Sequence, residues 1–152
     1  MTPQKFLKYS LGIPIIDEEH WSIFETAGAI EHDLNRGKYE NIRALLQRFR
    51  GEFAINCTTE DEVMCRVDYP GIADHRAAHR NLFILIDTLI DLPHDKETKD
   101  LIIDGLEDVF AEHIFQYDLT MAHYLHSLEE LRPSKYVLKR PEERDSGLMP
   151  LS

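Results

Sequence analysis

The chain has 152 residues, of which 43% are hydrophobic and 30% are charged, and its formal net charge is −11. This length supports one domain with one core, and the composition is typical of a soluble globular protein. The negative charge disfavours nucleic acid or an anionic membrane as a partner, because both would repel it. No segment is apolar for long enough to span a bilayer, and the start MTPQKFLKYS lacks the apolar stretch of a signal peptide. We therefore expect a cytoplasmic protein.

Hydrophobic residues recur at helical spacing after an irregular arm, residues 1–16. Helices are predicted over 17–35, with Asp17 as the N-cap, over 40–66, over 72–92, and from 96 to beyond His113. The connections are short, so consecutive helices should pack antiparallel. The expected fold is all-α: an up-down-up-down four-helix bundle over residues 1–132, followed by a polar tail at 133–152. Cys57 and Cys65 would lie about 12 Å apart on one helix, too far for a disulfide.

Polar residues interrupt the apolar stripes of all four predicted helices. They are His20 near the start of the first, Asn56 and Glu60 near the end of the second, His75 and His79 near the start of the third, and His113 and Asp118 late in the fourth. In an up-down-up-down bundle these four places meet at one end. We therefore expect one polar layer in the core at that end.

The spacings within this layer suit metal binding. Residues four apart lie one turn apart on the same helical face, so His75 and His79 can bind one ion. Imidazole and carboxylate together suit iron, manganese or zinc rather than calcium. Two carboxylates from different helices, Glu60 and Asp118, could bridge two ions. The other interpretation is a buried hydrogen-bond network without metal, which would leave many polar groups in need of partners.

One spacing is irregular for a helix. His113 and Asp118 are five residues apart, which turns their side chains by roughly 140° in a regular α-helix. Both reach the core only if the helix is locally distorted, so we expect a π-type bulge between them.

The chain resembles the bacterial hemerythrins, which are oxygen-binding di-iron four-helix bundles. The resemblance covers residues 10–125 and rests on several motifs: Gly12 with Asp17-Glu18-Glu19-His20, Glu60-Asp61-Glu62-Val63-Met64, Tyr69-Pro70, His75 with His79, and His113-Ile114 followed by Asp118. The resemblance implies one iron held by His75, His79 and His113. It implies a second iron held by His20 and a helix-borne histidine, with Glu60, Asp118 and an oxo or hydroxo group bridging the two ions.

The sequence departs from this family at one ligand. The second histidine of the family falls four residues before Glu60, where this chain has Asn56. The His20 iron thus loses a nitrogen ligand, and either the weaker amide oxygen of Asn56 or water takes its place. Loss of a ligand weakens binding of that ion and opens a coordination position.

Three functions remain open at this point. The first is a protein that binds or senses dioxygen or a related diatomic molecule. The second is a peroxidase-like or oxidase-like enzyme that uses the position opened by Asn56. The third is a structural or regulatory module with one ion at His75, His79 and His113. The sequence names no protein partner.

Overall fold

The computed structural model describes residues 7–131, except for the side chains of 107–109, 130 and 131, and over this range it contains helices and no strand. The bundle consists of α2 (Pro14–Asn35), α3 (Ile42–Arg66), α4 (Ile72–Asp91) and α5 (Lys99–His113). Helix α5 continues through a π-helix, η3 (Ile114–Asp118), into α6 (Leu119–Leu131). Two short 3-10 helices, η1 (Leu7–Tyr9) and η2 (Tyr39–Asn41), precede α2 and α3, respectively. The predicted all-α class is confirmed.

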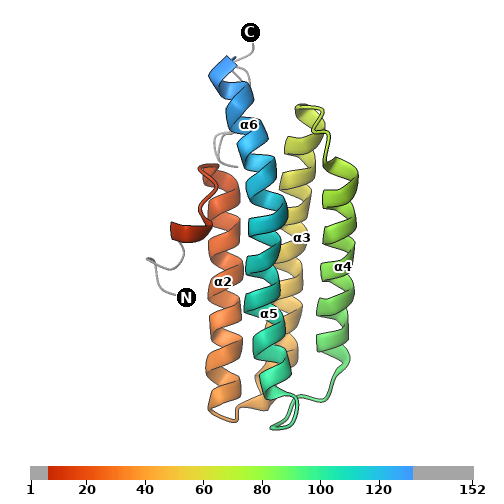
Figure 1. The fold of residues 1–152 in the computed structure, drawn as a ribbon. Coiled ribbons are helices and arrows are strands. Elements are labelled where there is room, and N and C mark those ends of the chain that lie inside the picture. Colours follow the sequence, from red (N-terminus) through yellow and green to blue (C-terminus); the bar gives the residue numbers. More distant parts are fainter. Residues whose placement is uncertain (1–6, 132–152) are drawn as a thin grey trace, which may run out of the picture.

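The helices alternate in direction and form a closed ring of neighbours, in which α2 contacts α3 and α5, and α4 contacts α3 and α5 (Figure 1). The starts of α2 and α4 therefore lie at the same end as the end of α3 and the later part of α5, as the predicted up-down-up-down order requires. In the part of the chain that the structure describes, no helix has the length and hydrophobicity needed to cross a bilayer. The expected tail, residues 133–152, lies outside the described residues.

The first helix begins at Pro14, three residues before the predicted Asp17. Proline suits the first helical position because its fixed φ is helical and its missing N–H is not needed there. Asp17 is therefore not the N-cap, and the prediction of an irregular arm through residue 16 was wrong. The carboxylate of Asp17 instead accepts hydrogen bonds from the backbone N–H of Leu11 at 2.7 Å and of Gly12 at 3.2 Å. It thus folds the arm back onto the helix start.

The arm is also attached to α6. Gly12 has a φ of +71°, and a Cβ added there would lie 3.2 Å from Nε2 of His126. That nitrogen lies 2.7 Å from the carbonyl oxygen of Leu11, to which it donates a hydrogen bond. This bond is the largest of the effects that raise the pKa of His126. A glycine is required here both for the left-handed backbone and for the close approach of the imidazole.

The other helix boundaries fall close to the predictions. A 3-10 turn occupies 39–41, so α3 begins at Ile42 rather than at Glu40. The fourth helix begins at Lys99 rather than at Lys96, because the carboxylate of Asp95 accepts hydrogen bonds from the backbone N–H groups of residues 97 and 98. These hydrogen bonds stabilise a turn before the helix.

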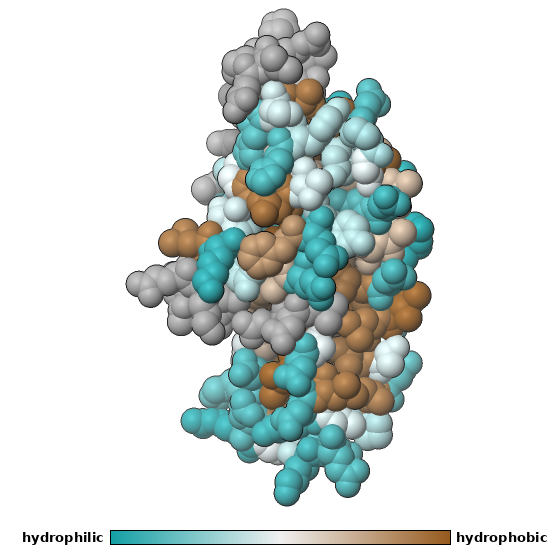
Figure 2. Space-filling view, viewed as in Figure 1, coloured by the Kyte–Doolittle hydropathy of each residue, from teal (hydrophilic) through white to brown (hydrophobic). Residues whose placement is uncertain are grey.

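Below the polar layer the core is aromatic. Phe110 lies at its centre, with ring centroids 5.5 to 6.2 Å from three other buried rings: Phe24, Phe49 and Phe53. The same ring meets His20 edge-on at 5.5 Å, and Phe53 meets His79 edge-on at 5.7 Å. The buried histidines are thus packed against apolar rings that exclude water from one side of the polar layer. On the face shown in Figure 2, the lower end of the bundle is hydrophilic and an apolar area lies at the right.

Candidate metal centre

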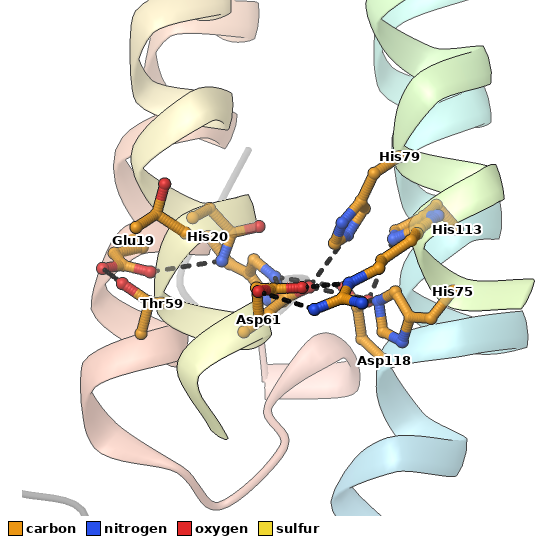
Figure 3. A network of polar contacts seen from close by, with 12 residues as sticks. Glu19, His20, Thr59, Asp61, His75, His79, His113 and Asp118 are labelled. Atoms are coloured by element: carbon orange, nitrogen blue, oxygen red, sulfur yellow. Dashed lines mark hydrogen bonds and ion pairs between the residues drawn. The ribbon is translucent and has the colours of Figure 1, made fainter. Parts of the chain in front are cut away.

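The structure brings the six predicted ligand side chains into one layer, and each is at most 5% exposed. The four helices of the bundle supply them: His20 from α2, Glu60 from α3, His75 and His79 from α4, His113 from the last residue of α5, and Asp118 from the last residue of η3, which continues α5. Figure 3 shows His75, His79 and His113 on one side of the site, with Asp118 below them. The predicted layer is therefore present.

The π-helix explains how His113 and Asp118 share a face. Residues 114–118 form the expected bulge, in which each turn contains more residues than an α-helical turn. The wider turn cancels most of the rotation that a five-residue step would cause. Nε2 of His113 consequently lies 3.0 Å from Oδ1 of Asp118. The π-type irregularity predicted from the spacing is confirmed.

Each of the two carboxylates faces histidines on both of its sides. For Glu60, Oε1 lies 3.3 Å from Nε2 of His20, whereas Oε2 lies 3.2 Å from His75 and 3.0 Å from His79. For Asp118, Oδ2 lies 3.2 Å from Nε2 of His20, whereas Oδ1 lies 3.0 Å from Nε2 of His75. The carboxylates thus separate one histidine on one side from three histidines on the other.

These distances match those between ligands of a shared ion. Two ligand atoms at right angles, each about 2.1 Å from one ion, lie about 3.0 Å apart. One ligand atom from each of five residues lies within 4.8 Å of all the others: Glu60, His75, His79, His113 and Asp118. The donor set is therefore compatible with a metal cation.

Several polar atoms of this layer are buried but have no hydrogen bond among the described residues. They are Nε2 of His79 and of His113, both carboxylate oxygens of Asp118, Nδ1 of His20 and of His75, and Oδ1 of Asn56. Some lie close to one another without the alignment that a hydrogen bond needs. Leaving such groups unpaired costs about 1–3 kcal/mol each. This deficit disfavours a pure hydrogen-bond network and fits a cation as the missing partner.

The electrostatics of the layer favour a bound cation. Burial and the charge of Asp118 both act to raise the pKa of Glu60, but its three histidine neighbours, His20, His75 and His79, outweigh them and hold that pKa well below its usual value. Burial likewise acts to raise the pKa of Asp118, and its histidine neighbours again lower it strongly. Burial alone would lower the pKa of His20, yet the two carboxylates raise it to about 10. Both carboxylates are therefore ionised at neutral pH.

Asn56 lies one turn before Glu60 and is fully buried. Its Nδ2 donates to Oε2 of Glu19 at 3.2 Å, and the hydroxyl of Thr59 donates to Oε1 of the same carboxylate at 2.6 Å. Burial raises the pKa of Glu19, although these two hydrogen bonds oppose the effect. Glu19 belongs to the motif that precedes His20, but the sequence alone assigned it no role, and it did not single out Thr59. The only available signal was their position one residue before His20 and one residue before Glu60.

Two surface pockets reach the layer. One, of about 270 Å³, lies between α4 and α5 and is lined by His113 and Tyr117. The other, of about 470 Å³, lies between α3 and α4 and is lined by Cys57 and His79. Burial raises the pKa of the Cys57 thiol strongly, and the nearby Glu60 charge adds to this, so the cysteine is a neutral thiol. Both pockets border the three-histidine side of the layer.

The remaining histidines lie outside the layer, and His32 and His123 are exposed. Nε2 of His94 lies 3.0 Å from the carbonyl oxygen of Leu89 at the end of α4. Cys57 and Cys65 are both free and lie on α3, in agreement with the prediction of no disulfide.

The fold and the layer together define a metal-binding four-helix bundle with a buried histidine and carboxylate cluster. A family model described as the hemerythrin HHE cation-binding domain matches residues 11–125. The chain therefore belongs to the hemerythrin family, and the resemblance suggested by the motifs is confirmed. No curated protein and no solved structure matches the chain.

Proposed function

We propose that this protein holds two non-haem iron ions and binds or senses dioxygen or a related diatomic molecule such as nitric oxide. The observation that supports this most directly is the two-sided placement of the carboxylates. Glu60 and Asp118 each present one oxygen to His20 and the other to the three-histidine side. Carboxylates placed in this way between helices are how four-helix bundles bridge two ions. In our proposal an oxo or hydroxo group completes the bridge.

Iron is the metal that we propose from the donor set and the family. Imidazole and carboxylate donors also suit manganese and zinc, but membership of the hemerythrin family favours iron. A bound pair of reduced iron ions supplies the two electrons that dioxygen accepts. The protein contributes the setting: Phe53 and Phe110 exclude water from below the histidines, and the buried carboxylates balance the charge of the cations.

The two sides of the centre differ in how many protein donors they offer. The three-histidine side has three imidazoles and two carboxylates, whereas the other side has His20 and the same two carboxylates. An ion with five protein donors has little room for a further ligand, and an ion with fewer donors has more. We therefore assign the diatomic ligand to the His20 side.

The proposal is tested by metal content and absorption. Protein purified without added metal and then loaded anaerobically with Fe²⁺ should contain about two iron ions per chain, as the two-sided site requires. Admission of air should produce a new visible absorption band, and the Glu60→Ala variant should lose both the iron and the band. His123→Asn is the matched control, because it removes an exposed histidine outside the layer. Full iron loading without any new band would overturn dioxygen binding, and a single tightly bound zinc ion would overturn the di-iron centre.

A further inference from the structure

Asn56 occupies the place in α3 from which a side chain can reach the His20 side of the centre. It lies four residues before Glu60, hence one helical turn away on the same face, and it is 0% exposed. Its Oδ1 is buried and has no hydrogen-bond partner in the described part of the chain. An unpaired amide oxygen at this position is a potential ligand for a cation.

The orientation of this amide is determined by Glu19. The Asn56 amide turns its NH₂ group toward Glu19, and a carboxyl oxygen of Glu19 accepts the hydrogen bond. Nδ2 of Asn56 lies 3.2 Å from Oε2 of Glu19, and the rigid planar amide then directs Oδ1 away from Glu19. Only the oxygen of an amide is an acceptor, so this orientation leaves the metal-binding atom free.

Glu19 is itself held in place from a second direction. The hydroxyl of Thr59, three residues after Asn56, donates to Oε1 of Glu19 at 2.6 Å. Glu19 and Thr59 lie on one side of the site in Figure 3, and His75, His79 and His113 lie on the opposite side. Glu19 also lines the groove between α2 and α3, where Glu52 and Ile55 are its neighbours. The carboxylate thus holds the NH₂ group of Asn56 toward this groove.

We infer that Glu19 is a positioning residue that fixes the Asn56 amide so that Oδ1, together with His20, binds the second cation. This inference rests on the proposed two-ion centre and specifies how its incomplete half is built. The His20 side then has one imidazole and one amide oxygen besides the two carboxylates, whereas the opposite side has three imidazoles. The second ion is consequently held through more oxygen and less nitrogen than the first.

The test is an anaerobic titration of the metal-free protein with Fe²⁺ that resolves two binding steps. In the Asn56→Ala variant the second step should be lost while the first remains. In Glu19→Leu the amide is free to rotate, and the dissociation constant of the second step should rise about 10- to 100-fold, as for other partners that orient metal ligands. Glu19→Gln retains an acceptor oxygen and should remain within a few-fold of wild type.

Two further variants separate orientation from folding. Thr59→Val removes one of the two hydrogen bonds on Glu19 without changing charge, and it should weaken only the second step. Glu25→Leu removes an exposed acid from the same helix and should change neither step. The inference is overturned, and the two-ion centre left intact, if Glu19→Leu changes the dissociation constant of neither binding step. The same holds if Asn56→Ala leaves the second binding step unchanged. A wild-type protein that binds only one Fe²⁺ would overturn both.

Discussion

Asp118→Asn isolates the contribution of one buried carboxylate without leaving a cavity. The side chain is 0% exposed, and its oxygens lie 3.0 to 3.2 Å from the Nε2 atoms of three histidines. Removal of one partner from a buried charged set costs about 3–5 kcal/mol. For a chain of this size each kcal/mol lowers Tm by about 2–4 °C, so we expect a fall of about 6–20 °C.

The measurement is thermal unfolding followed by circular dichroism, with a strong chelator present so that bound ions do not contribute. Without chelator, Fe²⁺ should raise the Tm of the wild type, because a ligand that binds only the folded state stabilises it, and it should raise that of Asp118→Asn much less. Asp104→Asn is the matched control, because it makes the same chemical change at an exposed position on α5. If Asp118→Asn has the same Tm as this control in chelator, the histidines do not depend on Asp118 and the electrostatic argument fails.

Three further predictions concern the frame of the site. Phe53→Ala should lower the free energy of unfolding in urea by about 3–5 kcal/mol, because the ring is fully buried against other rings. The hydrogen bond from His126 to the carbonyl oxygen of Leu11 raises the pKa of His126 above 6.5. The protonated side chain therefore stabilises the folded protein fully below pH 6.5, and this stabilisation is lost as the pH rises through the folded-state pKa. The stability difference between wild type and His126→Ala should thus be about 1 kcal/mol at about pH 6 and smaller at about pH 9 in matched urea titrations. Deletion of Gln116 should convert the π-helix to a regular α-helix and leave the metal content at the wild-type value in metal analysis. Deletion of Asp104 should instead turn the downstream residues of the layer by about 100° and abolish metal binding.

The layer could be located from the sequence because it depends on periodicity and chain direction. Helical spacing placed His20, Glu60 and His79 on core faces, and the alternating direction of the helices placed them at one end. The π-helix could be predicted because no regular helix brings a five-residue step from His113 to Asp118 onto one face. These conclusions require only the number of residues per helical turn and the antiparallel order that short connections impose on consecutive helices.

The surroundings of Asn56 could not be predicted in the same way. The hydrogen bond from Asn56 to Glu19 joins two helices, and its existence depends on their rotation and separation rather than on a pattern within either. The start of α2 was misplaced for a related reason. Aspartate is a common N-cap residue, but here the arm folds back over Asp17, and the backbone N–H groups of Leu11 and Gly12 donate hydrogen bonds to its carboxylate. Tertiary contacts thus decided what local preference left open.

The ligands of the centre are distributed over nearly the whole described chain, from His20 to Asp118. Neither the first two helices nor the last two can therefore assemble either half of the site alone, because Glu60 and Asp118 come from different pairs and each faces both sets of histidines. During synthesis on the ribosome, the growing chain offers no complete ligand set until α5 and the π-helix have emerged. Cation binding is thereby restricted to a chain in which all four helices of the bundle have been made, and shorter fragments bind the cation poorly.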